Sequence, residues 1–486
     1  MKIVLVNPPI MEKPHYAFKY NEYLLMPLGI LSIATMLKRN GHEVKIIDAY
    51  AEMLNIDNTV KRIFAEDPDM VGIGVLTPAY LLARKLTLKI ASNRKNNRPL
   101  IVMGGPHATL LPEKIIQECP VDFLIKGEGE YSFTGLVAAI ENSADLDHIP
   151  GIYFGKNGMI LKGPENNCLK DLDDLPPLDY SLLNMDLYRA PLQWRPPLRI
   201  SNIMTTRGCP FDCPYCANRK LQKDVSYHSV ARIHREIETL VANYHSRRIV
   251  ICDSVFPSNR KRGFEFLKMM MDSGLNRRIT WFIQTRVELL DEEWVALSKK
   301  AGCSRISLGI ESGDSDILRS INKNFSPAEV IKVSKMVRKY GIYLSANFMF
   351  GHIGDTPETM KRTSWLSQVM DIDEATFFLL TPYPGTKTFE LAKKNHQVLS
   401  QDWDDYVKSG KFIDQKVAFV PKGLSAKQLL DIRRSAFLKF YLHPKIIWRD
   451  FVRMGPYYFT LKSLLRVMTI FHDLLSQLFN RRNAPN

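Results

Sequence analysis

The sequence predicts an α/β protein with a doubly wound, Rossmann-like parallel sheet, then a partial (β/α)6 TIM-like barrel, then a helical C-terminal extension. Two observations lead to this fold class. Short apolar runs rich in β-formers alternate with amphipathic stretches over most of the chain, which is the pattern of βαβ units. After about residue 425 the alternation gives way to a helical, basic and aromatic sequence. The 486 residues, 45% of them hydrophobic and 24% charged, are typical of globular domains.

The first predicted unit covers residues 1–150. Its apolar runs are separated by amphipathic stretches such as 28–39, which stops before Asn40-Gly41, a pair typical of a helix end. Because parallel strands need helical crossovers, these runs predict a doubly wound sheet. The expected strands are 3–6, 44–47, 71–75, 100–103 and 122–125.

Loops rich in glycine and proline follow four of these strands. In a doubly wound sheet, ligands bind beyond the carboxyl ends of the strands. Any one of these loops could simply close a turn, but four together favour a binding site at this edge. The loops are Asn7-Pro8-Pro9, Leu76-Thr77-Pro78, Gly104-Gly105-Pro106-His107 and Gly127-Glu128-Gly129-Glu130.

Residues 151–199 are predicted to be an ordered linker, because they contain proline-rich stretches around Pro176-Pro177 and Pro196-Pro197. A second α/β unit is expected over residues 200–425. Six βα repeats are too few for an eight-unit barrel and predict a partial one. Its expected strands are 200–206, 248–252, 280–284, 304–310, 343–350 and 376–380.

The net charge of +15 is concentrated at the C-terminus. Residues 427–486 contain eleven Lys and Arg against three Asp, a net +8. In the predicted extension 426–486, aromatic residues are interspersed with Lys and Arg, which suits an anionic membrane surface or an apolar substrate. The alternative is a helical cap over the barrel with solvated Lys and Arg. No RNA-binding barrel is recognisable, so we expect no nucleic-acid partner.

Several features favour a cytoplasmic protein, with peripheral membrane contact as an option. The N-terminal apolar run is too short for a signal peptide, and no uncharged run approaches the roughly 20 residues of a spanning helix. Seven cysteines, three of them bunched at 209, 213 and 216, favour a reducing compartment and a metal site over a disulfide framework.

Those three cysteines form the strongest signal in the sequence. Cys209, Cys213 and Cys216 lie just after a predicted strand, on a loop tightened by Gly208 and two prolines. Three thiolates on one loop can ligate three irons of a [4Fe–4S] cluster and leave the fourth iron open. A structural zinc site would need a fourth ligand nearby, whereas the next histidines lie farther along the chain.

With Tyr215 before the last cysteine, this spacing resembles the radical S-adenosylmethionine (SAM) superfamily. The resemblance implies that the open iron chelates SAM and that an electron from the cluster cleaves SAM to a 5′-deoxyadenosyl radical. Downstream strand ends resemble that family's SAM-contacting segments, although Ser254 stands where relatives often carry an acid. Arg286 and Glu311 could alternatively form structural salt bridges, and Cys252 and Cys303 are expected to be buried and outside the cluster. The SAM-binding residues implied are Tyr215, Asp253, Ser254, Arg286, Glu311, Ser312 and Asn347.

The N-terminal unit is similar to the cobalamin-binding domain of the class B radical methylases, and the resemblance covers about residues 1–425. The Asp-x-His-x-x-Gly loop that ligates cobalt elsewhere is absent, which agrees with relatives that hold cobalamin without a protein histidine. His107 is expected to pack against the nucleotide tail or to cap a helix. The cobalamin-binding residues implied are Pro8, Leu28, Gly29, Thr77, Gly104, Gly105, Pro106, His107, Gly127, Glu128 and Glu130.

The resemblance implies methylation of an unactivated carbon of a small-molecule substrate through a 5′-deoxyadenosyl radical and methylcobalamin. We expect a lipid or isoprenoid substrate and an external electron donor of the flavodoxin or ferredoxin type. One alternative keeps all three cofactors ([4Fe–4S] cluster, SAM and cobalamin) but performs an oxidative cyclisation or rearrangement. A second alternative is a non-catalytic cobalamin or redox sensor.

Overall fold

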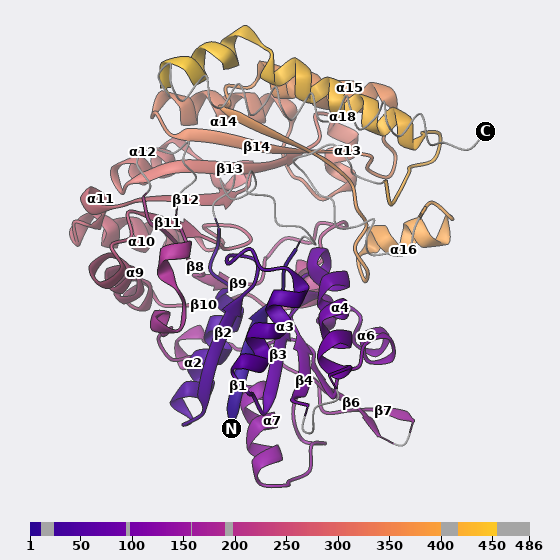
Figure 1. Ribbon diagram of the computed structural model, residues 1–486. Helices are drawn as coiled ribbons and strands as arrows, with labels where there is room; N and C mark the ends of the chain where they lie inside the picture. The colour runs from indigo at the N-terminus through magenta and orange to yellow at the C-terminus, as the bar shows by residue number, and fades with distance from the viewer. Residues whose placement is uncertain (11–23, 94–97, 157, 190–197, 400–416, 454–486) are drawn as a thin grey trace.

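The computed structural model describes residues 1–10, 24–93, 98–156, 158–189, 198–399 and 417–453. These residues form two α/β units, each built around one sheet (Figure 1). The N-terminal unit lies at the bottom of Figure 1 and the second unit at the top. Residues at the carboxyl ends of strands from both sheets line one cavity between the units.

The N-terminal sheet has seven strands in the order β2-β1-β3-β4-β5-β6-β7. The first five pair in parallel, and the strand order reverses at β1 and β3, which is the ligand-binding switch point of doubly wound sheets. All five predicted strands are present. Their bounds are β1 (Lys2–Asn7), β2 (Glu43–Asp48), β3 (Met70–Gly74), β4 (Leu100–Gly104) and β5 (Phe123–Ile125).

Helices cover both faces of this sheet, as double winding requires. On one face α2 (Leu28–Arg39) and α7 (Glu130–Glu141) bury residues such as Leu37 and Leu136. The predicted helix 28–39 matches α2. The other face is covered by α3 (Ile56–Ala65), α4 (Tyr80–Ala91) and α6 (Pro112–Glu118), and two short elements, η1 (Thr77–Ala79) and α5 (Pro106–Leu110), follow β3 and β4.

The sheet continues into the segment that the sequence predicted as a linker. An antiparallel hairpin of β6 (Ile152–Lys156) and β7 (Met159–Lys162) extends the sheet beyond β5. The predicted Pro196-Pro197 stretch lies outside the described residues. After β7 the chain makes three short 3-10 turns, η2 (Leu172–Asp174), η3 (Tyr180–Leu182) and η4 (Met185–Leu187).

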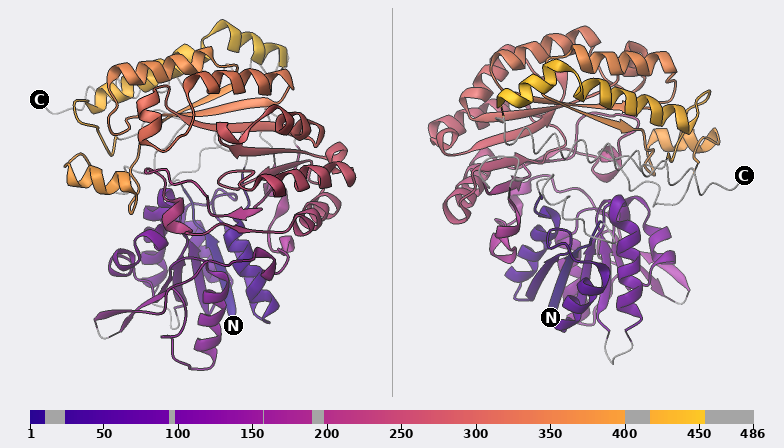
Figure 2. Two further views of the ribbon diagram at one scale, coloured as in Figure 1. Left: turned by 180° about the vertical axis from the view of Figure 1, so that it is seen from behind. Right: turned by 45° about the horizontal axis from the view of Figure 1, so that its top comes forward.

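The second sheet has six parallel strands in sequential order, which confirms the predicted partial barrel. Figure 2 shows from behind how its helices lie along the outer face. A two-residue antiparallel pair, β9 (Thr206–Arg207) with β10 (Ser226–Tyr227), forms a separate ribbon that the sequence did not predict. The six strands are β8 (Ile200–Ile203), β11 (Arg248–Ile251), β12 (Thr280–Thr285), β13 (Cys303–Glu311), β14 (Tyr343–Phe350) and β15 (Glu374–Leu379).

A continuous core joins these strands to the outer helices. Trp281 and Trp294 are both fully buried in it, and the Phe256 ring packs against both of them. Capping boxes define two helix starts, at Ser326 and Thr356. The helices are α8 (Asn218–Leu221), α9 (Val230–Tyr244), α10 (Arg260–Asp272), α11 (Leu275–Arg278), α12 (Glu292–Lys300), α13 (Ser315–Ser320), α14 (Pro327–Lys339), α15 (Pro357–Val369) and α16 (Lys387–Lys394), with the 3-10 turn η5 (Val287–Leu289) after β12.

The start of the basic and aromatic extension packs on the second unit. Helix α18 (Ala426–Tyr441) lies against α15 and β15, and its buried Phe440 meets Phe377 edge-on. Residues 454–486, which carry much of the predicted aromatic segment, lie outside the described residues. Among the helices that the structure describes, none has the length and apolarity needed to cross a membrane.

Candidate active site

The three cysteines lie on one loop between β9 and β10, all as partly exposed free thiols. Gly208 precedes them with φ +87°, and a Cβ there would lie 2.4 Å from the Asp224 carbonyl oxygen, so the turn requires glycine. Burial, above all, raises the pKa of Cys209 and Cys216. Because a metal ligand must be a thiolate, iron binding has to displace these protons.

Arg286, which follows β12, holds this loop. Its Nη1 donates to the Cys213 Sγ (3.4 Å), and its guanidinium lies 3.9 Å from the Phe211 ring centroid. Its other nitrogens donate to Glu288 and to the Asn322 carbonyl. The structure therefore brings Arg286 to the cysteines, and the residue also forms the salt bridge given as the alternative.

Glu311, at the end of β13, has φ +70°, a backbone conformation that favours glycine. Its side chain is buried, and Lys323 Nζ lies 3.5 Å from its carboxylate. A Cβ on Gly309 would lie 2.8 Å from that carboxylate, so glycine at 309 leaves room for the side chain. The strand end therefore presents a fixed, buried ion pair.

Tyr215 and His352 face each other next to the cysteines. Their ring centroids are 5.8 Å apart in an edge-on arrangement, and burial raises the pKa of Tyr215. His352 is 1% exposed, and burial lowers its pKa to about 3, so the ring is neutral. In the described part of the chain its Nε2 has no hydrogen-bond partner. A buried nitrogen of this kind suits a polar ligand beside Tyr215.

Two predicted SAM contacts at the end of β11 make hydrogen bonds within the protein. The Asp253 carboxylate accepts from the backbone N–H groups of Thr205 (2.6 Å) and Thr206 (3.1 Å), which ties β11 to the chain after β8. Burial raises the pKa of Asp253 to about 6 despite these bonds. Ser254 accepts a hydrogen bond from Asn218 (2.9 Å), two residues beyond Cys216.

Two further predicted SAM contacts lie on neighbouring strands. Ser312 follows β13, and its hydroxyl lies 3.3 Å from the Thr363 hydroxyl. Asn347 lies within β14, and its Nδ2 donates to the Ser307 hydroxyl at 3.5 Å. Ser312 therefore lies directly beyond the carboxyl end of β13, and Asn347 lies in the carboxyl half of the neighbouring strand β14.

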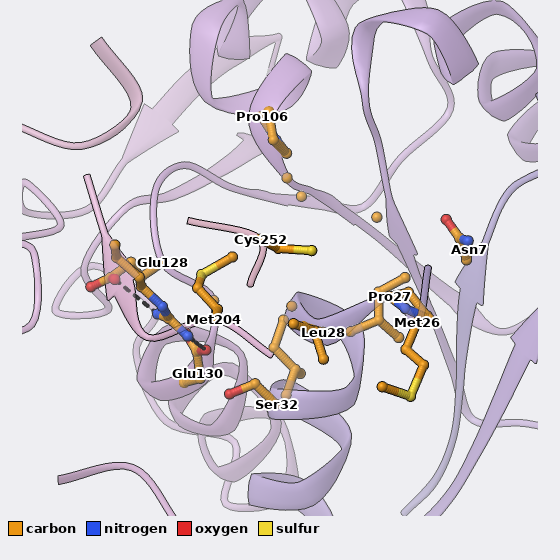
Figure 3. Close-up of a pocket in the computed structure, with 18 of the residues that line it drawn as sticks. Asn7, Met26, Pro27, Leu28, Ser32, Pro106, Glu128, Glu130, Met204 and Cys252 are labelled. Atoms are coloured by element: carbon orange, nitrogen blue, oxygen red, sulfur yellow. Dashed lines mark hydrogen bonds and ion pairs between the residues drawn. The ribbon is translucent and has the colours of Figure 1, made fainter. Parts of the chain in front are cut away.

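A cavity of about 720 Å³ lies where the two sheet edges meet (Figure 3). Its volume is within the usual range for small-molecule sites. Figure 3 shows Leu28, Met204 and Cys252 around it, on elements of both units. Cys303 is buried, as expected, whereas Cys252 is only partly buried because it lines the cavity. The predicted cobalamin contacts that line the cavity are Leu28, Gly29, Gly104, Gly105, Pro106, Gly127, Glu128 and Glu130.

Glycine and a fixed first loop shape this wall. Gly105 has φ +96°, and a Cβ there would lie 2.9 Å from the Val75 backbone nitrogen. The Asn7 side chain, at the end of β1, donates to Asp48 (2.8 Å), which also accepts from the Tyr188 hydroxyl (2.7 Å). Backbone at two strand ends is thereby presented to the cavity in a fixed position.

Glu128 and Glu130 form ion pairs with the second unit. Arg207 Nη1 donates to Glu128 (2.8 Å) and Nη2 donates to Glu130 (2.6 Å); Figure 3 draws these contacts as dashed lines. Burial alone would lower the pKa of Arg207, but Glu130 and Glu128 outweigh it and hold the pKa above its ordinary value. Burial alone would raise the pKa of Glu130, but Arg207 holds it below its ordinary value.

Three predicted cobalamin contacts, Pro8, Thr77 and His107, are not among the residues that line this cavity. His107 is fully buried, its Nδ1 lies 3.0 Å from the Thr77 hydroxyl, and it packs against the Tyr80 ring. Burial lowers the pKa of His107 to about 4. These contacts are therefore inside the N-terminal unit.

The residues present fit the three cofactors. Three thiols share one glycine-turned loop, which suits three irons of a cluster, although no side-chain group in the described ranges converges on a single metal ion. The unpartnered nitrogen of His352 beside Tyr215 suits a polar ligand next to the cysteines. The glycine-walled cavity at the switch point suits a bulky ring with a nucleotide tail.

Three residues of this site were not predicted from the sequence: Arg207, Lys323 and His352. Lys323 lies in a connection between two helices and carries no motif. Arg207 precedes the first cysteine by two residues and His352 follows the glycine after β14, so position alone could have marked both. Their partners are distant in sequence, 77 residues for Arg207 and Glu130, which no local pattern reveals.

Comparison with known proteins identifies both units. Residues 203–364 match the radical SAM superfamily, and residues 20–137 match the B12 binding domain family. The solved structure of the cobalamin-dependent S-adenosylmethionine radical enzyme OxsB with aqua-cobalamin and S-adenosylmethionine bound shares the fold, with a TM-score of 0.73 and 16% identity over 98% of this chain and 72% of that one. The protein is thus a radical SAM enzyme with a cobalamin-binding domain, and its cofactors are a [4Fe–4S] cluster, SAM and cobalamin.

Similar proteins of other organisms indicate the kind of radical SAM enzyme. An uncharacterized methyltransferase of Pyrococcus horikoshii is 34% identical over 96% of this chain and 98% of its own length. The anaerobic magnesium-protoporphyrin IX monomethyl ester cyclase of Cereibacter sphaeroides is 29% identical over 87% and 68%. The hopanoid C-3 methylase of Methylococcus capsulatus is 23% identical over 83% and 74%. The chain belongs to the cobalamin-dependent radical SAM methyltransferase family, which also has cyclase relatives.

Proposed function

We propose that this enzyme methylates an unactivated carbon of an apolar small molecule of the lipid or isoprenoid class. The observation that carries the proposal is the cavity between the two sheet edges, whose wall is made largely of aliphatic side chains and glycine backbone. Such a wall favours a ligand that buries apolar surface. The hopanoid C-3 methylase among the relatives supports the same substrate class.

The two sheet edges are assigned different cofactors. When bound, the cofactors supply hydrogen-atom abstraction and methyl-group carriage. We assign the cluster to the three cysteines, with Arg286 orienting their loop, and SAM to the surface between Tyr215 and Glu311. We assign cobalamin to the glycine-walled side of the cavity. The contribution of the chain is then placement of the reacting groups and exclusion of water.

The test is an anaerobic incubation of the reconstituted enzyme with SAM carrying a trideuterated methyl group and an apolar extract of the source cells. The proposal predicts lipid-like products that have gained one trideuteromethyl group, absent with Cys213→Ala. Label found only in water-soluble products would overturn the substrate class. Formation of 5′-deoxyadenosine without any labelled product would favour cyclisation, the reaction named for the protoporphyrin relative.

We also propose that the C-terminal extension touches an anionic membrane surface where such a substrate resides. Helical residues 444–453 expose Trp448 (66%) and Val452 (63%) one turn apart, with Phe451 stacked on Trp448. Flotation with phosphatidylserine vesicles is expected for the wild type and reduced for Trp448→Ser/Val452→Ser. Equal flotation of the two proteins would contradict the membrane role.

We further propose that the enzyme works in the cytoplasm and takes its electron from an external flavodoxin- or ferredoxin-type protein. Cluster reduction is a one-electron step at low potential, which such proteins supply. Replacing dithionite by reduced flavodoxin or ferredoxin should therefore sustain 5′-deoxyadenosine formation. Activity with dithionite but none with either reduced flavodoxin or reduced ferredoxin would contradict the proposed donor.

A further inference from the structure

The base of the cysteine loop is held by a side chain of the other unit. The loop runs from Gly208 to Val225 between the paired strands β9 and β10. Arg207, just before the loop, donates to Glu128 Oε1 at 2.8 Å. Gln222, near the far end of the loop, donates to the same oxygen at 3.4 Å. One carboxylate of the cobalamin domain therefore contacts both ends of the loop that carries the three cysteines.

A second carboxylate completes the contact. Glu130, the first residue of α7, is 3% exposed and accepts from both Nη atoms of Arg207, at 2.6 and 3.3 Å. The other Glu128 oxygen accepts from the Leu169 backbone N–H at 2.7 Å. We call Glu128, Glu130, Arg207 and Gln222 the staple. Charge-assisted, partly bidentate bonds of this kind fix orientation as well as distance.

The staple is also part of the cavity wall, since all four of its residues line the cavity. Glu128 and Glu130 alternate with Gly127 and Gly129 on the loop that leads into α7. A ligand that fills the cavity therefore presses on the segment whose carboxylates hold the cysteine loop. These hydrogen bonds connect the occupancy of the cavity with the conformation of the cysteine loop. Coupling between two sites requires a physical connection of this kind.

We propose that the staple couples the two cofactor sites, so that a formed cluster tightens cobalamin binding and bound cobalamin slows loss of the cluster. In the coupled state Arg207 and Gln222 hold the cysteine loop closed against Glu128. In the uncoupled state Arg207 and Gln222 no longer contact Glu128, and the pairing of β9 with β10 alone holds the ends of the loop together. The proposal rests on the cofactors of the family and not on the substrate, so a failed substrate search would leave it intact.

The test compares hydroxocobalamin affinity in cluster-free and cluster-loaded protein by anaerobic equilibrium dialysis. The wild type should bind about tenfold more tightly when the cluster is present, within the usual range of coupling between sites. The neutral triple variant Glu128→Gln/Glu130→Gln/Arg207→Met leaves no unpaired buried charge and should keep the fold. Its affinity ratio should fall to about one, with the same iron content after reconstitution. Arg207→Lys, which keeps the charge but loses the planar fork, should give an intermediate ratio.

A matched control is available within the same sheet. Arg98 makes a bidentate pair with Asp122, at 2.7 Å for each contact, away from the cavity, so Arg98→Met should leave the affinity ratio at the wild-type value. Iron release to a ferrous chelator gives an independent readout, and cobalamin should slow it in the wild type but not in the triple variant. The proposal is overturned if the triple variant retains the wild-type ratio, or if the wild type itself shows a ratio of one.

Discussion

The carboxyl edge of the six-stranded sheet and the carboxyl edge of the seven-stranded sheet present different chemistry to the space between them. The first carries charged and polar side chains in fixed contacts, such as Arg286 on Cys213 and Lys323 on Glu311. The second carries mainly glycine backbone and aliphatic groups, with Gly105 in a conformation that excludes other residues. The first edge therefore acts mainly through the functional groups of its side chains, and the second mainly through the volume that its small residues leave for a ligand. Deleting a side chain should damage the first edge, whereas the second edge, apart from Glu128 and Glu130, should be damaged by adding one.

The largest effect is expected from Cys213→Ala on the polar edge. Loss of one of the three proposed cluster ligands should lower iron content and 5′-deoxyadenosine formation by about a hundredfold or more, because cluster assembly would depend on each thiolate. Iron analysis and anaerobic product quantification measure both quantities. Cobalamin binding should persist at the level of the cluster-free wild type, since the glycine-walled edge is untouched. Complete loss of cobalamin binding in this variant would contradict the separate roles of the two edges.

The ion pair at the end of β13 gives the next effect. Lys323→Met leaves the buried Glu311 carboxylate without its counter-charge and should lower the free energy of unfolding by about 3 kcal/mol. Urea unfolding of the metal-free protein measures the loss. Adding Glu311→Gln should recover part of it, and Lys299→Met, at an exposed lysine bonded to the Gly341 carbonyl, is the control. A loss no larger than that of the control would show that Lys323 is not needed to balance Glu311.

The buried carboxyl group of Asp253 should make the free energy of unfolding depend on pH. Burial raises its pKa from 3.8 to about 6, so the folded protein holds this proton more tightly than the unfolded chain. The contribution of Asp253 to stability is therefore present at low pH and falls as pH rises from about 4 to about 6. Relative to wild type, metal-free Asp253→Asn should gain about 2 to 3 kcal/mol in unfolding free energy over that interval. A difference that stays constant with pH would contradict the buried, proton-holding state of this carboxyl.

The smallest effect is expected from adding a side chain at a glycine of the second edge. Gly29 of α2 lines the cavity, and a Cβ there meets nothing within 4 Å. Gly29→Leu should weaken hydroxocobalamin binding about tenfold, which is about 1.4 kcal/mol, by filling the space. It should also raise unfolding free energy by up to about 1 kcal/mol through helix propensity. Gly135→Leu in α7, equally open but away from the cavity, should give the second effect without the first.

Most of the fold was predictable because strand position depends on local pattern. Eleven expected strands are present, and their apolar runs are long enough to show a period. The hairpin β6–β7 was missed because residues 151–199 were assigned as one linker from the proline pairs at 176–177 and 196–197, although the hairpin itself contains no proline. The pair β9–β10 was missed because two residues carry no periodicity. The grouping of the three cysteines could be predicted from their spacing, since all three lie within a single loop.

Contacts across the domain interface could not be predicted from sequence. Glu128 and Glu130 were predicted to contact cobalamin; they line the cavity, but their pairing with Arg207 depends on how the two domains meet. Asp253 was predicted to approach SAM, and the hydrogen bonds that its carboxylate accepts from the chain after β8 were not foreseen. Such contacts join residues 47 to 79 positions apart, and side-chain direction at a strand end is set by packing that a single sequence does not show.

The most direct test of the central claim quantifies nucleoside products. The protein is reconstituted anaerobically with iron, sulfide and cobalamin, reduced and supplied with SAM, beside Cys213→Ala. A methyltransferase that uses both edges should form 5′-deoxyadenosine and S-adenosylhomocysteine, and the 5′-deoxyadenosine should vanish in the variant. Formation of 5′-deoxyadenosine alone would contradict methyl transfer and favour a cyclase or rearrangement. Products that do not depend on Cys213 would contradict the radical chemistry itself.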